Sequence, residues 1–450
     1  MKNRRCHAVF AAGAVAAMML AGHACGQAAC EHQKITASDG ENDDQFGFAV
    51  ALRGPTAAIG AFGAKSQGPY TGEVRIFEHE GSAWIETGRL TAPQAEQGDD
   101  FGYSVAMSNS LLAVGAPNIF PSLAPGRVHL FTRFAGEWVH MQRLNGSQAG
   151  SGARFGQSLG VHGSRVVVGS PEDLHADDTG KVYVFELNDE HPDEGWKEAA
   201  GSDRFGAAVG VSADRIIVGA PRHGGSNAGA AYIFRRTSEG LWVQEAKFSG
   251  AAGSQTGSAV AISGRLAVVG APGVGSGRAD IYRHADGAWI HEQTLTSGGQ
   301  GFGWAVACEG DLVLIGGRSD PAYGGKNATR VYRRVANEWV HADGLHVAVP
   351  AVPDLFSRSI ALEGNVVLVG ANRDGTDKQF QPGAAYAFGL NGCSYCPADF
   401  DVSGSVDPHD VLALLDVYAD ADPAADFNGD GTVNSLDVIA FLRAWAEGCD

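Results

Sequence analysis

The chain has 450 residues and is acidic, with 51 Asp and Glu residues against 33 Lys and Arg residues and a net charge of -18. This balance argues against nucleic-acid binding, because no basic stripe offers contacts to phosphates. Glycine contributes 63 residues, about twice its ordinary frequency, which favours a protein made mostly of short elements and tight turns.

The first 28 residues have the pattern of an export signal. Basic residues are followed by the apolar run 8–21 and then by small residues that predict a cut after Ala28. A membrane-spanning helix needs about 20 apolar residues, and no such run follows. We therefore expect a signal peptide at 1–28, a secreted protein and no transmembrane segment. A lipid anchor at Cys25 is the alternative, although the residues before it form a poor attachment context.

Seven copies of a two-part motif follow the signal. Each begins with Phe-Gly or a degraded form of it, and a second glycine lies 14 positions after the Phe or its replacement. The first parts begin at Phe46, Phe101, Phe155, Phe205, Thr256, Phe302 and Phe356, and the second glycines are Gly60, Gly115, Gly169, Gly219, Gly270, Gly316 and Gly370. The spacing is constant within a copy, whereas copies recur every 46 to 55 residues. One rigid unit with variable loops is therefore repeated, as in a closed array of small sheets.

The second copy shows what one unit contains. Residues 101–106, 111–114, 127–131 and 138–144 read as four short strands bounded by Gly, Pro and Asn. Seven such units predict an all-β seven-bladed propeller over residues 29–392, whose closure hides most strand edges. We interpret the motif Phe residues as filling the space between blades. The Trp residues that open the outer strands also read as packing, rather than as a sugar-binding platform.

The ends of the repeat array predict how the ring closes. The seventh unit lacks its Trp strand, and residues 30–35 match the outer strand of the second unit. The first strand after the signal should therefore complete the last blade. On this alignment Cys30 lies across the final hairpin from Cys393, close enough to bridge. Export favours pairing, so we expect a Cys30–Cys393 disulfide that locks the ring.

The repeat resembles the FG-GAP family, known best from the seven-bladed heads of integrin α chains. The resemblance covers roughly residues 30–390. Blades of that family often carry an Asp-rich calcium loop between their first two strands. Here the connection is only a tight turn, as at 162–164, 213–214 and 263–264. Too few oxygen ligands are available in these turns, so we expect a metal-free propeller.

Residues 393–450 differ sharply in charge, with eleven Asp and one Glu against a single Arg. Two twelve-residue loops place oxygen-bearing residues at positions 1, 3, 5, 7, 9 and 12, with glycine at position 6. They are Asp399, Asp401, Ser403, Ser405, Asp407 and Asp410, and then Asp426, Asn428, Asp430, Thr432, Asn434 and Asp437. This spacing wraps a chain around one Ca²⁺, so we expect two ions. An acidic disordered tail is the alternative, but apolar helices are expected over 411–418 and 438–445.

These paired loops, each followed by a helix and not preceded by one, resemble a type I dockerin, a small α-helical domain with paired EF-hand-like loops. The resemblance covers residues 396–450 and implies calcium-dependent attachment to a cohesin-like or cell-surface protein. The positions that usually recognise the partner are here Pro408, His409, Ser435 and Leu436. They differ between the two copies, which puts a symmetric binding mode and a conventional cohesin in doubt. Cys396 and Cys449 bracket the module and are expected to pair, which leaves Cys308 as a buried free thiol.

The first functional hypothesis is a secreted, non-catalytic binding or adhesion protein. Its propeller would bind a protein or polysaccharide through the loops 118–125, 172–179, 222–228, 319–328 and 372–382. The alternative is a component of a polysaccharide-degrading system, with acids such as Asp173, Asp177, Asp178, Asp320 and Asp374 on one rim. A purely structural surface protein is the third possibility. The histidines His79, His129, His140, His291 and His341 read as surface strand positions rather than as ligands.

Overall fold

The computed structural model describes residues 30–80, 83–119, 124–147, 149–172, 180–187, 203–273, 275–323, 326–346, 355–375, 381–390, 408–419, 427 and 433–447. The expected signal peptide and Cys393, Cys396 and Cys449 lie outside these ranges, so neither expected disulfide is tested. No helix among the described residues is long and apolar enough to cross a membrane.

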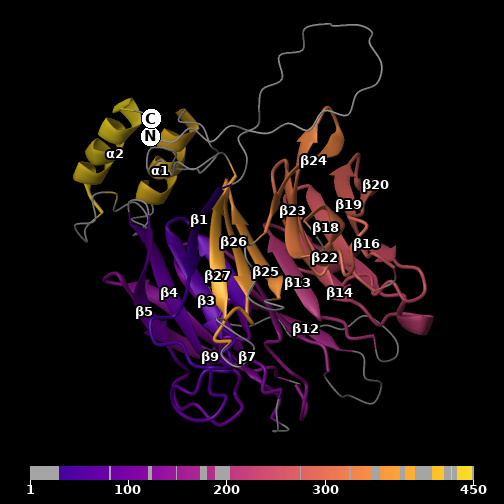
Figure 1. Ribbon diagram of the computed structural model, residues 1–450, viewed down its shortest axis with the longest axis horizontal. Helices are drawn as coiled ribbons and strands as arrows, with labels where there is room; N and C mark the ends of the chain where they lie inside the picture. Colours follow the sequence, from indigo (N-terminus) through magenta and orange to yellow (C-terminus); the bar gives the residue numbers. More distant parts are fainter. Residues whose placement is uncertain are drawn as a thin grey trace, which may run out of the picture.

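The described chain from β1 to β27 forms seven antiparallel sheets in sequence order (Figure 1). The first three blades are β2 (Ala49–Arg53), β3 (Thr56–Ala61), β4 (Glu73–Glu80) and β5 (Ala83–Leu90); β6 (Ser104–Met107), β7 (Leu111–Ala116), β8 (Arg127–Phe134) and β9 (Glu137–Leu144); and β10 (Ser158–His162), β11 (Arg165–Ser170) and β12 (Lys181–Glu186). The expected fourth strand of the third blade, with Trp196, lies outside the described residues.

The remaining blades repeat this order. They are β13 (Ala208–Ser212), β14 (Arg215–Ala220), β15 (Ala230–Arg236) and β16 (Trp242–Ser249); β17 (Ala259–Ser263), β18 (Leu266–Ala271), β19 (Arg278–Ala285) and β20 (Ala288–Leu295); β21 (Ala305–Glu309), β22 (Leu312–Asp320), β23 (Lys326–Val335) and β24 (Glu338–Leu345); and β25 (Phe356–Glu363), β26 (Val366–Ala371), β27 (Ala384–Gly389) and β1 (Cys30–Ile35). Two short 3₁₀ turns, Gly225–Asn227 and Pro321–Tyr323, lie in the loops between second and third strands. The seven-bladed propeller is confirmed.

The ring closes as the sequence predicts. Strand β1 pairs antiparallel with β27, with Cys30 opposite Gly389 and Ile35 opposite Ala385. Figure 1 shows the indigo β1 beside the orange β27, so the two ends of the repeat array share one blade. The innermost strands of successive blades contact one another around the ring, including β25 with β2. These seven inner strands surround the central axis.

A hydrogen bond explains the constant spacing inside the motif. The amide of Gly102 donates to the carbonyl of Gly115, the second glycine of the same blade, at 3.0 Å. Five other copies have the same bond. Gly102 has a φ of 91°, a conformation that side chains disfavour. Ser357, which replaces glycine in the seventh copy, keeps a φ of 71°. The motif is therefore a closed backbone loop of fixed length.

The second glycine of each blade touches the motif of the next blade. A Cβ atom on Gly115 would lie 2.1 Å from the carbonyl oxygen of Gly156 in the third blade. The same approach joins the last blade to the first, where a Cβ on Gly370 would lie 1.9 Å from the Gly47 oxygen. The repeated glycines therefore allow neighbouring blades to approach backbone to backbone.

One strand boundary differs from the prediction. The first strand of the second blade begins at Ser104, whereas the alternation of apolar residues placed its start at Phe101. Asp100 and Gly102 both have positive φ, which no β-strand allows, so the Phe-Gly pair forms a turn before the strand. Phe101 is nevertheless fully buried between the first and second blades, in a cluster with Ile76 and Phe131. The role expected for the motif Phe is confirmed.

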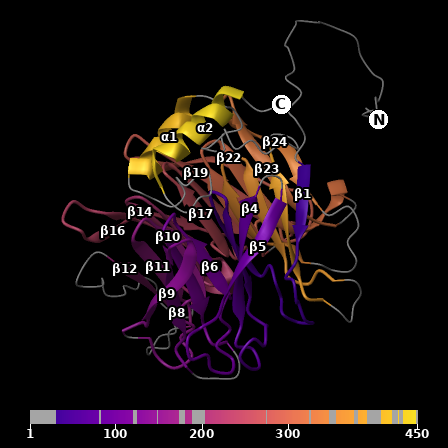
Figure 2. The same cartoon turned by 90° about the vertical axis from the view of Figure 1, so that its left-hand side faces the viewer.

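Two helices follow the propeller, α1 (Pro408–Ala419) and α2 (Ser435–Glu447). They contain the helical segments expected at 411–418 and 438–445. Figure 2 shows them lying side by side. Leu414 and Phe441 are fully buried between them, with Phe427 and Trp445 packed around this small core. Each helix begins at position 10 of its expected calcium loop.

Candidate functional site

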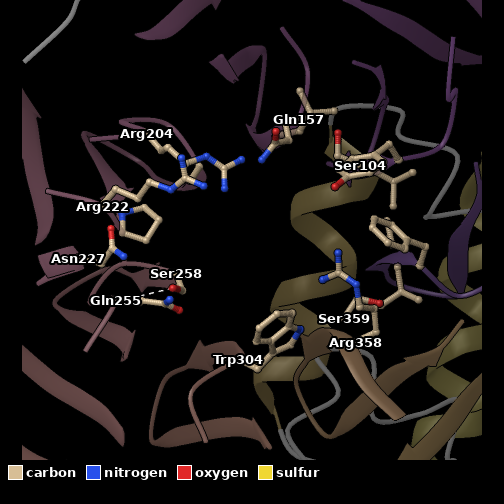
Figure 3. A pocket seen from close by; sticks show the side chains of 18 residues that line it. Ser104, Gln157, Arg204, Arg222, Asn227, Gln255, Ser258, Trp304, Arg358 and Ser359 are labelled. Atoms are coloured by element: carbon tan, nitrogen blue, oxygen red, sulfur yellow. Dashed lines mark hydrogen bonds between the residues drawn. The ribbon is translucent and has the colours of Figure 1, made fainter. Parts of the chain in front are cut away.

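A cavity of about 530 Å³ opens at one mouth of the central channel. Residues from all seven blades line it, and most of them lie at the start of the innermost strands (Figure 3). The motif loops and the loops between second and third strands border the same mouth. This is the face on which the sequence placed the binding loops, and the predicted loop 222–228 contributes Arg222 and Asn227 to the wall.

One position of the repeat supplies most of the lining. It is the residue that follows the motif glycine, and its seven occupants are Phe48, Tyr103, Gln157, Ala207, Ser258, Trp304 and Arg358. The glycine beside it is kept in six copies because the backbone requires it, while this neighbour changes in every copy. A rigid loop thus presents seven different side chains towards the axis. These residues were not predicted from the sequence, although the seven copies, aligned on their glycines, show the varied position.

Aromatic rings and arginines form a continuous stack along one side of the mouth. The Arg318 guanidinium carbon lies 3.6 Å from the centre of the Trp304 ring, and that of Arg358 lies 4.0 Å from the centre of the Phe48 ring. Phe48 also packs against Tyr103, with ring centroids 4.6 Å apart. Such contacts between cations and aromatic faces hold the guanidinium groups in place.

The mouth is rich in positive charge. Among the described residues, no carboxylate forms an ion pair with Arg222, Arg318 or Arg358. Burial lowers the pKa of Arg358 and of Arg318 from the usual arginine value. Arg204 does have a partner, because its Nε lies 2.7 Å from Glu172 Oε1. The sign of this charge is opposite to that of the whole chain.

A smaller cavity of about 180 Å³ adjoins the main one and shares Phe48, Trp304 and Arg358 with it. Asn372 and Asn327, from two further loops that the sequence predicted for binding, line this smaller cavity. Asn372 is buried, and its Oδ1 has no hydrogen-bond partner among the described residues. The predicted loops 319–328 and 372–382 therefore also border the mouth.

The acids considered for catalysis are engaged in structural contacts where they are described. Both oxygens of Asp320 bind Arg330, at 2.6 and 2.8 Å, and hydrogen bonding to Arg330 outweighs burial, so the pKa of Asp320 is lowered. Oδ2 of Asp374 accepts a hydrogen bond from the Tyr386 hydroxyl and lies 2.9 Å from Lys34 Nζ. Asp173, Asp177 and Asp178 lie outside the described residues. The described residues contain no group of three or more potential metal ligands.

One histidine prediction is wrong. His129, expected on the surface, is only 2 % exposed on β8, because its neighbouring strand and the motif Phe101 cover it. Its Nδ1 lies 3.1 Å from His140 Nε2, and burial lowers the pKa of His129 to about 4. Of the other four histidines, His79 and His140 are half-buried. His291 and His341 are exposed.

Cys308 is a free thiol on β21; the residue as a whole is half-buried, and its thiol is turned towards the protein interior. The side chain packs at the edge of the cluster that contains Val313. Burial raises the pKa of the Cys308 thiol to about 12, so it stays protonated.

The structure describes only part of the expected calcium loops. Asn434 and Asp437, positions 9 and 12 of the second loop, are described, and Asp410 lies in the first turn of α1. Asp437 is fully buried, and its Oδ2 accepts a hydrogen bond of 2.8 Å from the backbone N–H of Asn434. Of the expected recognition residues, Pro408, Ser435 and Leu436 are exposed, whereas only the backbone of His409 is described. The other loop residues lie outside the described ranges: Asp399, Asp401, Ser403, Ser405, Asp407, Asp426, Asn428, Asp430 and Thr432.

A closed ring of seven small antiparallel sheets defines a β-propeller. The family model described as FG-GAP repeat matches residues 30–77, 84–131, 138–185, 197–234 and 348–388. The chain is therefore an FG-GAP repeat propeller. Several matched segments begin in an outer strand and end in the third strand of the next blade, which is the offset that ring closure requires. No curated protein matches the chain significantly.

Proposed function

We propose that this chain is a secreted, non-catalytic binding protein whose propeller binds its ligand at the mouth of the central channel. A second part of the proposal is that the C-terminal module, residues 393–450, attaches this head to a cohesin-like or cell-surface partner when calcium is bound. The observation that carries the first part is the varied position after the motif glycine. All seven of its side chains line one pocket.

The scaffold around this pocket supports binding rather than packing as its role. A residue needed for the ring would recur in every blade, as the glycines do. Residues that vary on a rigid scaffold are typical of recognition surfaces. The volume of about 530 Å³ lies within the range of about 300–1,000 Å³ that small-ligand sites occupy. Of the acids considered for the alternative of a polysaccharide-degrading enzyme, the two that are described, Asp320 and Asp374, are held in structural contacts.

The mouth can be tested by filling it. Ala207 is half-buried in the lining, so Ala207→Trp would obstruct the pocket without changing its charge. Ala288→Trp, at an exposed position on the outer strand β20, is the matched control. Wild-type protein and both variants would be applied to one array of oligosaccharides and peptides. We expect Ala207→Trp to lose the ligands that the other two proteins retain; full retention would contradict the proposal.

Two observations support calcium binding by the C-terminal module. Both helices begin at position 10 of a loop, which places position 12 in the first helical turn in each copy. Asp437 is a buried carboxylate at that position. Calcium is bound by six to eight oxygens, and Asp426, Asn428, Asp430, Thr432, Asn434 and Asp437 would supply them in the second loop. Bound calcium would offset the mutual repulsion of these acids.

Calcium titration tests this part directly. By calorimetry, we expect about two ions to bind the wild-type chain and about one to bind Asp437→Ala. Asp311→Ala is the control, because Asp311 is an exposed acid of the propeller. Equal calcium binding by all three proteins would reject the assignment of the second loop.

The partner surface is supported by exposed apolar side chains on the two helices. Leu436, Ile439 and Leu442 follow one another along α2 at intervals of three residues and are 57 %, 46 % and 41 % exposed. This spacing places them on one helical face. Leu412 and Leu415 form a similar pair on α1. Exposed apolar faces of this kind are typical of protein interfaces.

A further inference from the structure

We propose that the mouth of the channel binds an acidic sugar, with its arginines holding the carboxylate and its amide side chains holding the hydroxyls. The inference rests on the proposed function, because it names the ligand class of the same mouth. It goes further in assigning roles to Arg222, Arg358 and Gln157.

The positive charge of the mouth points to an anionic ligand. In a chain of net charge -18, the two cavities are lined by five arginines: Arg204, Arg222, Arg318, Arg358 and Arg373. Only Arg204 among them forms an ion pair with a described carboxylate, that of Glu172. An unpaired cluster of like charges opposes folding, so its retention at a pocket is explained by an anion that neutralises it. The guanidinium fork matches a carboxylate with two parallel hydrogen bonds.

These charges lie on opposite sides of the cavity. Figure 3 shows Arg204 and Arg222 on one side of the cavity and Arg358 on the other, with their side chains directed into it. Arg358 is held by its stack on Phe48, and Trp304 lies beside it, 5.9 Å from its guanidinium carbon. Because aromatic contacts fix the guanidinium, less side-chain entropy is lost when a ligand binds. An anion between the two sides would be contacted from both.

Neutral amide side chains distinguish a site for a sugar from a site for a simple anion. Gln157, Asn227 and Gln255 line the main cavity, and Asn372 lines the adjoining one. Asn227 and Gln255 are exposed, so their amides can donate hydrogen bonds to ligand hydroxyls and accept hydrogen bonds from them. A ligand that carries both a carboxylate and hydroxyls binds the arginines and these amides together.

The size of the cavity suits a small sugar. A cavity of about 530 Å³ accepts one or two sugar rings, and the seven varied side chains are among the residues that line it. Gln255 and Asn227 stand near Arg222 on the wall (Figure 3). Neutral amide groups beside charged arginines suit a ligand that alternates hydroxyl and carboxylate groups around a ring.

The test uses a pair of ligands that differ only in charge. The full chain would be titrated by calorimetry with digalacturonate and with its dimethyl ester, which has the same shape and no carboxylate charge. We expect the acid to bind at least roughly tenfold more tightly, because a hydrogen bond to a charged group contributes more than one to a neutral group. Equal affinity for both forms would overturn the proposal, as would tighter binding of hexaglutamate.

Variants assign the effect to the arginines. Arg222 is exposed, so Arg222→Gln removes a charge without disturbing packing, and we expect it to weaken digalacturonate binding roughly tenfold. Arg265→Gln is the control, because Arg265 lies in the turn between β17 and β18, at the opposite end of the inner strands. Unchanged affinity in Arg222→Gln, or equal loss in both variants, would overturn the assignment. Thermal melts of each variant would exclude unfolding as the cause.

The two proposals fail separately. If the neutral ester binds as well as the acid and Ala207→Trp abolishes both, the mouth is a binding site but its ligand is not recognised by charge. If Ala207→Trp leaves the binding of digalacturonate unchanged, the sugar binds elsewhere and the proposed function of the mouth fails as well.

Discussion

At the scale of single residues, the second glycine of each motif limits how closely two blades can pack. A Cβ atom on Gly115 would lie 2.1 Å from the Gly156 carbonyl oxygen and 2.2 Å from Ser104 Oγ. Real Cβ atoms do not approach backbone oxygens to this distance, so the neighbouring blade would have to move. Ser104 itself donates to the Gly156 oxygen at 2.6 Å, which ties the same two blades together.

Gly115→Ala should therefore destabilise the protein by about 3 kcal/mol, the upper part of the usual range for overpacking. Gly225 is a matched control, since a Cβ atom there would meet no other atom within 4 Å. Denaturant titration of both variants measures the difference. A cost below about 1 kcal/mol for Gly115→Ala would show that the blades separate more easily than the geometry implies.

His129 makes stability depend on pH. Burial lowers its pKa in the folded protein from 6.5 to about 4, so protonation favours the unfolded chain. Neutral His129 contributes up to about 3 kcal/mol to the free energy of unfolding. This contribution is complete above pH 6.5 and is lost as the pH falls from 6.5 to 4.

We expect His129→Gln to flatten this part of the stability profile, measured as the melting temperature between pH 4 and pH 7. His291→Gln serves as the control, because His291 is exposed on β20. A slope that is the same in wild type and in His129→Gln would assign the acid sensitivity to other groups.

At the scale of the elements, the outer strands of neighbouring blades are joined by glutamine side chains. Gln293 on β20 exchanges hydrogen bonds of 2.8 and 3.0 Å with the backbone of Trp339 on β24. Gln33 on β1 makes the equivalent bonds of 2.7 and 3.0 Å with Trp84 on β5. Strand β1 is therefore a true outer strand of the seventh blade, although it comes from the other end of the chain.

Ile35 carries most of the apolar contact that β1 makes with the ring. It is 1 % exposed, in a cluster that joins the seventh and first blades. Ile35→Ala should cost about 3 kcal/mol, as expected for a large-to-small change in a core. Val139→Ala, at a position that is 46 % exposed on the outer strand β9, should cost less than about 0.5 kcal/mol.

Hydrogen exchange would locate the damage caused by Ile35→Ala. Loss of protection should be greatest in β27, which loses the stability of its partner strand. If protection falls equally in all blades, the ring does not open at this seam.

The repeat predicted the strands well because Gly, Pro or Asn stands close to most strand ends. The prediction of the first strand failed at Phe101 because alternation continues through the motif, while the backbone conformation at Asp100 and Gly102 ends the strand. The alternation of apolar and polar side chains carries no information on the backbone angle φ. The start of β6 at Ser104 could therefore not be predicted from the apolar residues alone.

At the scale of the whole molecule, the site depends on closure of the ring. Phe48 and Arg358 lie near opposite ends of the propeller sequence, yet the guanidinium of one stacks on the ring of the other. The sequence predicted three of the loops that border the mouth, 222–228, 319–328 and 372–382, because loop length varies between copies. The predicted loops 118–125 and 172–179 lie partly outside the described residues. It did not predict which side chains meet on the axis, since that requires the order and tilt of all seven blades.

Hydrogen–deuterium exchange of the full chain with and without saturating digalacturonate tests the central claim that the mouth is the binding site. We predict slower exchange in the motif loops that precede β2, β6, β10, β13, β17, β21 and β25, with no change in the turns at the other end of the inner strands. Protection confined to those turns or to the outer strands, or no protection at all, would contradict the account.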